Sequence, residues 1–432
     1  MSKIAILGAG IAGLTAAYDL LKAGNQVSIY EKNAAVGGLA GGFKKANWNW
    51  SVEKFYHHWF QADKAMLDLI KKLGWQDQII FSRPKTVVYY QDKFYPLDSP
   101  LAVLLFPGFS LLEKLRFGLV TFYLRYIASW RPLEKYSSKD WLHRYYGAHL
   151  YKTLFEPLLI GKFSHNYQEV PMAWFWARFK ARSPKLGTFE GGFQNFLDKF
   201  ADEIQKNGAN FIFNCTATKI EPQANGRLKI ITDKGKEVFD KVLVTTSPKL
   251  LANLVPSLDN NYKQKLFSLR SIGAVVVVLA LHYKLSKDGF YWFNLPKAAG
   301  FPFLALVEHT NFISADKFGG EHILYCGDYL PPDHEYFQLT KEELIKRFLP
   351  SLKQINADFH RSWIIDSWLF RLPYAQPIPT LNHSKNIPDI KTPIPNLYFA
   401  SMSQIYPWDR GTNYAVELAH RAAHLIMGRF DS

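Results

Sequence analysis

The chain has 432 residues, of which 48% are hydrophobic and 21% charged, with 27 Gly, 23 Pro and only 2 Cys. This composition excludes collagen-like, disulfide-stapled and wholly disordered chains, and the length predicts two or three structural units. Lys and Arg number 52 against 37 Asp and Glu, a formal charge of +15, and 16% of the residues are aromatic. Such a chain suits a nucleic acid, an anionic membrane surface or an acidic ligand as partner.

The sequence carries no pattern for export, membrane spanning or metal binding. The apolar stretch after Lys3, Ile4 to Leu7, is too short for a secretory signal. No uncharged apolar run reaches the roughly 18 residues of a membrane-spanning helix. Cys215 and Cys326 alone cannot build a disulfide framework or a four-ligand zinc site, and the histidines lack metal-ligand spacing. We therefore expect a cytoplasmic protein without a metal site.

A nucleotide-binding pattern occupies the N-terminus. The strand Lys3 to Leu7 leads directly into a glycine-rich turn, and the helix Leu14 to Ala23 follows. Gly8 makes the tight turn, Gly10 lets the backbone approach a pyrophosphate, and Gly13 lets the helix pack against the strand. The strand, turn and helix are the context that the G-x-G-x-x-G pattern requires, so we predict dinucleotide binding.

Two further features complete this pattern. The helix N-terminus, at Ile11 and Ala12, supplies free N–H groups and a positive dipole end for phosphates. A second strand, Val27 to Tyr30, ends at Glu31, where a carboxylate accepts hydrogen bonds from adenosine ribose hydroxyls, and Lys32 is its neighbour. The pattern alone leaves the choice between NAD and FAD open.

A second glycine pair favours FAD. Gly37 and Gly38 follow the ribose carboxylate closely, and Leu39 and Ala40 come next. This arrangement resembles the flavin amine oxidase and protoporphyrinogen oxidase superfamily, to which UDP-galactopyranose mutases and phytoene desaturases are related. The resemblance implies an FAD cofactor with these four residues at its diphosphate. Amine oxidases usually carry Arg where this chain has Leu39, which favours the other branches.

The resemblance continues in two later segments. Gly191 opens a helical stretch that leads to Ala217, whose backbone would face the adenine, and to a turn at Thr246. The strand that ends at Ser401 and a glycine turn close the flavin site in the family, with contacts here from Gly411, Thr412 and Asn413. The family's acidic residue after the strand is missing, and Asp409 is a candidate replacement. The closing loop has no cysteine, so we predict non-covalent FAD.

The resemblance implies an α/β fold with a discontinuous, Rossmann-like FAD-binding domain. We expect this domain to comprise residues 1–90, 188–250 and 390–432. A helical insert at 91–187 and an antiparallel-sheet substrate domain at 251–389 complete the expected organisation.

The insert is basic and aromatic. Between Lys93 and Lys180 there are twelve basic and six acidic side chains, interleaved with Phe, Tyr, Trp and Leu. This segment resembles the membrane-associating insert of protoporphyrinogen oxidases and suits a helix lying in a lipid headgroup layer. A helical cap with buried apolar residues is the alternative. Peripheral attachment to the inner face of the membrane is thus open, whereas nucleic acid is not expected because no binding module is present.

Four residues are candidates for chemistry. His57 and His58 follow the first nucleotide-binding unit, where related mutases carry a histidine close to the flavin, and either could bind the flavin or move a proton. Arg371 and Tyr374 belong to a Pro-containing element similar to one that faces the flavin in protoporphyrinogen oxidases. Arg371 could pair with a substrate carboxylate or phosphate. Structural roles are the alternative for all four.

These features predict an FAD-dependent oxidoreductase that passes hydride from an amphipathic small molecule to flavin N5. An isoprenoid, a porphyrinogen or an amine would each fit as substrate. Two alternatives stay open: a redox-neutral isomerase resembling UDP-galactopyranose mutase, and a non-catalytic flavoprotein at a membrane surface. The sequence leaves the oligomeric state open.

Overall fold

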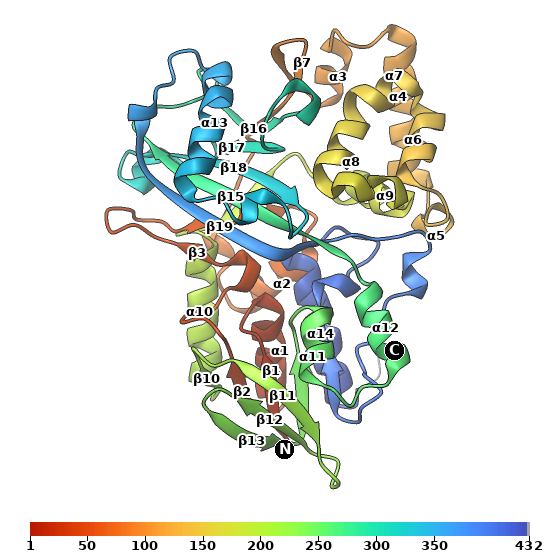
Figure 1. Cartoon of the computed structure of the whole chain (residues 1–432), viewed down its shortest axis with the longest axis vertical. Helices are drawn as coiled ribbons and strands as arrows, with labels where there is room; N and C mark the ends of the chain where they lie inside the picture. Colours follow the sequence, from red (N-terminus) through yellow and green to blue (C-terminus); the bar gives the residue numbers. More distant parts are fainter. Residues whose placement is uncertain (430–432) are drawn as a thin grey trace.

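The predicted nucleotide-binding region contains a parallel sheet, and the strands of this sheet come from distant parts of the chain. The computed structural model describes residues 1–429 (Figure 1). Apolar β1 lies at the sheet's centre, and every pairing in the sheet is parallel. The strand order is β10, β2, β1, β14 and β20, with bounds Asn210–Ile212, Gln26–Tyr30, Lys3–Leu7, Lys241–Val244 and Leu397–Phe399. The predicted α/β fold and the discontinuity of this unit are confirmed.

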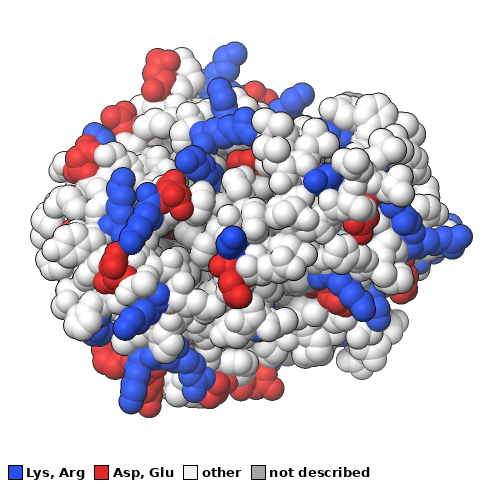
Figure 2. All heavy atoms as spheres, turned by 90° about the horizontal axis from the view of Figure 1, so that it is seen from above, with Lys and Arg blue, Asp and Glu red and all other residues white. Residues whose placement is uncertain are grey.

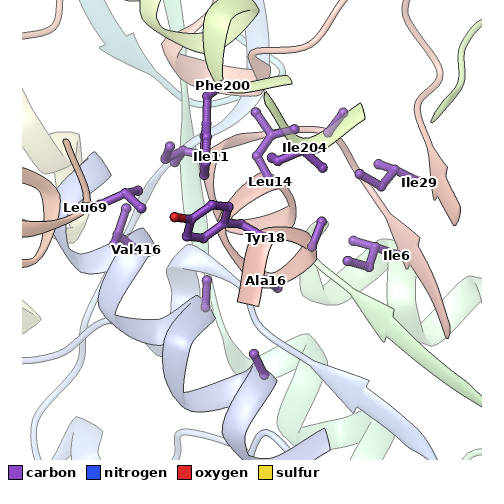
Figure 3. Packing of buried hydrophobic residues seen from close by; sticks show 14 of the residues in the cluster. Ile6, Ile11, Leu14, Ala16, Tyr18, Ile29, Leu69, Phe200, Ile204 and Val416 are labelled. Atoms are coloured by element: carbon purple, nitrogen blue, oxygen red, sulfur yellow. The ribbon is translucent and has the colours of Figure 1, made fainter. Parts of the chain in front are cut away.

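Helices cover one face of this sheet. They are α1 (Ile11–Lys22), α2 (Lys64–Lys72), α10 (Phe193–Lys206) and α14 (Thr412–Ile426). Helix α1 is buried on nearly all sides, with Tyr18 packed close to side chains of α2, α10 and α14 (Figure 3). This packing fixes the position of the N-terminus of α1, where phosphates are expected.

The other face is covered by an antiparallel hairpin unit and two helices. The unit comprises β11 (Ala217–Pro222), β12 (Leu228–Thr232) and β13 (Gly235–Phe239). Helices α11 (Pro248–Leu254) and α12 (Asn260–Ser268) share its core. We expected residues 251–268 in the substrate domain, but they pack against the parallel sheet instead.

A seven-stranded sheet forms the predicted substrate side. Its order is β19, β15, β18, β17, β16, β7 and β8, with bounds Ile364–Pro377, Ser271–Leu281, His322–Leu330, Ala305–Glu308, Phe290–Asn294, Lys85–Tyr90 and Lys93–Pro96. All pairings are antiparallel except that of β7 with β16. Helix α13 (Lys341–Ile355) packs on one face of this sheet. Strand β7, which we expected in the FAD-binding domain, therefore belongs here.

The insert is helical, as predicted, and lies beside the seven-stranded sheet (Figure 1). Ser137 caps α6 by accepting a hydrogen bond from the Asp140 N–H at 3.0 Å. The helices of the insert are α3 to α9, with bounds Pro100–Leu105, Leu111–Phe122, Trp130–Leu133, Ser138–Tyr146, Ala148–Leu150, Glu156–Phe163 and Met172–Ala181. Across residues 1–429, none of the helices combines the length and the apolarity needed to cross a membrane.

Two small sheets join these parts. One pairs β3 (Gly42–Phe43) with β4 (Val52–Glu53), and the other has the order β5 (Trp59–Phe60), β9 (Leu186–Phe189) and β6 (Ile79–Ser82). The segment between β4 and β5 carries both candidate histidines and is thereby held between the two sheets.

Candidate active site

The first glycine turn leaves room for a ligand at one position only. Gly8 has φ +112°, and a Cβ there would lie 2.7 Å from Thr245 Oγ1. A Cβ at Gly13 would lie 2.0 Å from the Gly8 oxygen, so these two glycines are required by the fold. A Cβ at Gly10 would meet no neighbour nearer than the Gly38 Cα, at 3.9 Å. Gly10 thus borders free space at the N-terminus of α1.

The second glycine pair lies directly against the first turn. Gly10 and Gly37 form a parallel bridge, and the Gly37 N–H donates to the Ala9 oxygen at 3.0 Å. Gln194 on α10 holds this segment: its Oε1 accepts from the Gly42 N–H at 2.8 Å, and its Nε2 donates to the Val36 oxygen at 3.2 Å. The two glycine segments therefore form one cradle, and Gln194 is a positioning residue that the sequence did not reveal.

Glu31 closes the cradle at the end of β2. The side chain is 6% exposed, and its Oε2 accepts from the Ala9 N–H at 2.9 Å. Its Oε1 accepts from Asn33, whose N–H and Nδ2 lie 3.0 and 2.7 Å away. The Cys215 N–H donates a hydrogen bond to the main-chain carbonyl oxygen of Glu31, so the segment leading to Ala217 lies beside Glu31. Lys32 is exposed.

Two buried hydroxyls near this turn have no partner. Thr246 Oγ1 follows β14, and Thr15 Oγ1 lies in α1, and neither forms a hydrogen bond among the described residues. Buried polar atoms are nearly always paired, so unpaired ones indicate a missing ligand or water. Together with the Gly10 space and the amides of Ile11 and Ala12 at the start of α1, they fit a dinucleotide.

The segment from Ser401 to Asn413, which we name the closing segment, uses its side chains within the protein. Trp59 Nε1 donates to Thr412 Oγ1 at 2.9 Å, and the Met66 N–H donates to Asn413 Oδ1 at 3.1 Å. Helix α14 begins after Gly411 without a side-chain cap, so its first backbone N–H groups are what the segment offers a ligand. The Thr412 hydroxyl and the Asn413 amide nitrogen can still donate hydrogen bonds, so the contacts of these residues with a flavin ring stay a prediction.

Ser401 and Tyr374, predicted separately, are brought together. The Tyr374 hydroxyl hydrogen-bonds to Ser401 Oγ at 2.8 Å and to Ser403 Oγ at 2.7 Å. Tyr374 fixes the closing segment to β19 rather than lining the cavity described below.

A small cavity lies between the cradle and the seven-stranded sheet. Its wall combines the residue after the glycine pair with aromatic, histidine and strand residues: Leu39, Phe55, Tyr56, His57, Ala274, Val276, Asp328, Tyr329, Ala375 and Arg410. The cavity therefore adjoins the glycine cradle on one side and polar groups on the other.

Both candidate histidines are held neutral. Burial, followed by the nearby Arg410 guanidinium, lowers the pKa of His57 to about 4. Burial, followed by Arg182 and His57, lowers the pKa of His58 to about 3. His57 Nδ1 contacts the Phe55 carbonyl oxygen, which can only accept, so Nδ1 carries the proton and Nε2 remains an acceptor. His58 Nδ1 is buried without a partner.

Arg371 is wrongly predicted as a pocket residue. Its guanidinium donates to the Tyr336 and Leu339 carbonyl oxygens, on the face of the sheet that α13 covers. Phe370 and Leu372, its neighbours on β19, point to the opposite face. Because successive strand residues alternate between faces, Arg371 cannot reach the cavity.

Asp409 cannot serve as the missing acidic residue of the closing segment. Lys162 Nζ donates to its Oδ2 at 2.7 Å, and Arg178 donates to the same oxygen at 3.1 Å. These cations hold the pKa of the carboxyl well below its usual range, against the opposing effect of burial. The carboxylate is committed to Lys162 and Arg178, which the sequence did not identify as site residues.

The fold and the glycine cradle fit a flavin-dependent protein. Residues 11–427 match the model of the flavin containing amine oxidoreductase family, and the chain belongs to this family. It is 24% identical to zeta-carotene desaturase of Solanum lycopersicum over 453 residues, 92% of this chain and 76% of the desaturase.

Solved structures share the fold over nearly the whole chain. A proposed protoporphyrinogen oxidase from Exiguobacterium sp. 255-15 has a TM-score of 0.78 at 17% identity, with 99% of each chain covered. Reduced UDP-galactopyranose mutase has a TM-score of 0.76 at 14% identity, covering 99% of this chain and 96% of the mutase. At these identities the likeness extends to the fold alone.

Proposed function

We propose that this chain is an oxidase- or desaturase-type oxidoreductase with non-covalently bound FAD. The observation that carries the proposal is the glycine cradle, which opens beside a cavity lined by Leu39 and His57. Neither cysteine belongs to the closing segment, and both are buried, so that segment has no thiol of its own to attach a flavin.

The residues that would hold FAD follow from the cradle. Gly10 leaves space for the diphosphate, Gly38 lies close against the Gly10 backbone, and the first amides of α1 would donate to the phosphates. Glu31 would accept from the ribose hydroxyls, and the backbone of Ala217 would face the adenine. Thr246 Oγ1 would gain the partner that it lacks. The bound flavin supplies a hydride acceptor, while the protein orients the substrate.

His57, which lines the cavity, would act on a bound molecule. Because its Nδ1 proton is committed to the Phe55 carbonyl, its Nε2 can accept a hydrogen bond or a proton inside the cavity. Its low pKa keeps Nε2 unprotonated at neutral pH, so it acts as an acceptor rather than as a general acid.

The test is a substrate screen under anaerobic conditions. The FAD-loaded protein is mixed with isoprenoid, porphyrinogen and amine compounds, and the flavin absorbance is followed at roughly 450 nm, an intrinsic property of the cofactor. We expect bleaching by an amphipathic member of one of these classes and recovery of colour with oxygen or a quinone. If none of the classes bleaches the flavin, the oxidoreductase proposal fails.

A redox-neutral isomerase is the second candidate. The observation that favours it is the pairing of His57 and Arg410 in one cavity, since polar groups there suit a sugar as well as a lipid. Such an enzyme would need flavin that is already reduced and would leave its redox state unchanged over a cycle. Product formation only after dithionite reduction, without net bleaching, distinguishes this candidate.

We also propose that the insert docks on an anionic lipid surface. Helix α4 has no buried residue, and Leu111 and Leu112 are 81% and 80% exposed. Leu101 and Leu105 of α3 and Phe122 of α4 extend this face, which we name the α3–α4 face. In Figure 2 the right-hand part of the surface, where the insert lies in Figure 1, is largely uncharged with Lys and Arg at its margin.

The chemistry of the α3–α4 face suits lipid. Exposed leucines at helical spacing gain free energy by entering an acyl layer, and nearby basic side chains are attracted to anionic headgroups. Flotation with vesicles tests this proposal: binding to vesicles with acidic lipid at low salt is expected, and its absence contradicts the proposal.

A further inference from the structure

Tyr56 is a polar residue of the cavity wall that the proposed function does not use. Two aromatic side chains hold its ring edge-on: the centroid of Trp292 lies at 4.8 Å and that of Tyr325 at 5.9 Å, each with an interplanar angle of 89°. Gly327 on β18 lies against the ring, since a Cβ there would be 3.0 Å from the Tyr56 Cε1 atom and 3.8 Å from its hydroxyl oxygen. This packing fixes the position of the phenol group.

The Tyr56 hydroxyl is a hydrogen-bond donor. Burial, followed by the nearby Tyr329, raises its pKa well above the usual value, and Arg410 opposes the shift. The hydroxyl therefore keeps its proton at neutral pH. Tyr329 and Arg410 line the same cavity, so the three side chains form its polar end.

Arg410 orders the hydrogen bonds next to Tyr56. Its Nε donates to Gln376 Oε1 at 3.0 Å, and a second nitrogen donates to the Tyr329 hydroxyl. The preceding residue, Asp409, forms a buried cluster with the two cations described above, which anchors this part of the chain. Because a guanidinium can only donate, the Tyr329 oxygen accepts and its own proton is directed away from Arg410. Donors, rather than acceptors, are thus what this end of the wall offers a ligand.

The next residue along the chain, His57, offers the opposite function. Its Nδ1 proton is committed to the Phe55 carbonyl oxygen, so its Nε2 is an acceptor in the same wall. A donor and a neutral acceptor therefore come from adjacent residues. Arg410 and Asp328 both border the cavity, so the wall has no excess of either charge. The cavity suits an uncharged group that both accepts and donates hydrogen bonds.

We infer that the substrate carries a hydroxyl group, which accepts a hydrogen bond from Tyr56 and donates one to His57 Nε2. The inference rests on the proposed function and specifies its substrate class. A hydroxyl has one donor and two acceptor lone pairs, so it satisfies both wall groups at once. An ammonium group can only donate, an ether oxygen can only accept, and a hydrocarbon leaves both wall groups unpaired. Phe55 and Val276 in the same wall would contact the adjoining carbon atoms.

Binding to FAD-loaded protein tests the inference without turnover. Hexanol, methoxypentane and hexylammonium have equal numbers of heavy atoms and are titrated separately, with calorimetry and the flavin spectrum as readouts. Hexanol is expected to bind about fivefold more tightly than either of the others, because each of these leaves one wall group unpaired. Equal affinity for methoxypentane, or tighter binding of hexylammonium, would overturn the inference.

A variant that removes only the donor locates the binding site. Tyr56→Phe is expected to weaken hexanol binding about fivefold, because one hydrogen bond is lost. Its affinity for hexylammonium, which has no acceptor for Tyr56, should stay unchanged. Tyr283→Phe, at a tyrosine that is 59% exposed, is the matched control and should bind every probe as wild type does. Unchanged hexanol affinity in Tyr56→Phe, or an equal loss for both probes, contradicts the inference.

Flavin content is measured in the same samples. Wild-type protein that retains FAD but does not prefer hexanol overturns this inference alone, whereas wild-type protein that never takes up FAD overturns the proposed function. If Tyr56→Phe loses FAD, the hydroxyl serves the cofactor and the inference is wrong.

Discussion

His58 and Asp409 show how burial sets the chemistry of single residues in this protein. His58 lies against Phe60 and Trp292, and Asp409 lies between the insert and β19, so their pKa values respond to different neighbours. Burial, followed by Arg182 and His57, keeps His58 neutral, whereas Asp409 lies between cations and stays ionised. Each therefore makes a distinct contribution to the free energy of unfolding.

Replacing His58 changes how stability depends on pH. The folded pKa of about 3 lies below the unfolded value of 6.5, so between these pH values only the unfolded chain binds the proton. The free energy of unfolding therefore falls on acidification by about 1.4 kcal/mol per pH unit for this group. His58→Phe should remove that part of the loss between pH 6.5 and pH 5 in urea unfolding.

The exposed His165 provides the matched control. His165→Phe should keep the wild-type difference in unfolding free energy between pH 6.5 and pH 5. An identical difference in wild type and His58→Phe would contradict the burial of a neutral imidazole.

Neutralising Asp409 should destabilise the fold. Asp409→Asn leaves Lys162 and Arg178 without their counter-charge, and breaking one partner of a buried ion pair costs about 3 kcal/mol. Denaturant unfolding measures the difference. Asp316→Asn removes an exposed surface partner of Lys317 and should leave stability almost unchanged. Equal effects of the two substitutions would show that the cluster is solvated.

Their spacing in the sequence shows that Arg371 and Tyr374 could not both face the flavin. Arg371 and Tyr374 are three positions apart, and in a regular strand such residues point to opposite faces. Only one could therefore face the flavin side, and the structure places Arg371 on the α13 face. Lys162, Arg178 and Arg410 were unpredictable because they come from separate segments whose meeting depends on the tertiary fold.

At the scale of elements, local patterns and tertiary packing differ in what they reveal. The turn of Gly8 and Gly10 and the strand Gln26–Tyr30 were predictable because each follows from steric needs within about 30 residues. The sheet to which the strand Lys85–Tyr90 belongs was not predictable, because it depends on the strand with which it pairs, here Phe290–Asn294. The helices of the insert were predictable, but only the structure shows that the α3–α4 face is left exposed.

The α3–α4 face makes a prediction at this scale. The double substitution Leu111→Asp and Leu112→Asp should abolish vesicle binding without lowering the thermal midpoint, because both side chains contact solvent. Phe267→Asp, on the exposed side of α12 at 54% exposure, is the matched control and should bind vesicles as wild type does. If the double variant still floats with vesicles, membrane binding comes from another surface or from charge alone.

At the scale of the whole molecule, the charge of +15 has two identified locations. One is the basic margin of the insert, and the other is the enclosed cluster around Asp409. Because the first is exposed and the second enclosed, salt should affect them differently. Vesicle binding should weaken between low salt and 0.5 M NaCl, whereas the stability contribution of Asp409 should change little. Salt-independent flotation would contradict an electrostatic part in docking.

The FAD site is itself a property of the whole molecule, since three distant segments form the parallel sheet. A ligand that contacts all three should stabilise the folded state, by about 2.7 kcal/mol at a hundredfold excess over its Kd. Apo protein should therefore show a higher thermal midpoint when FAD is added, and an unchanged midpoint would place the cofactor elsewhere.

The most direct test of the account is the FAD content of Gly10→Val protein beside wild type. The fold has room for a Cβ at Gly10, so a valine there fills the space assigned to the diphosphate. Gly118→Val, on exposed α4, is the control. We predict that wild type and Gly118→Val bind FAD that acid precipitation releases, while Gly10→Val folds but stays colourless. A yellow Gly10→Val protein would contradict the assignment of the cradle.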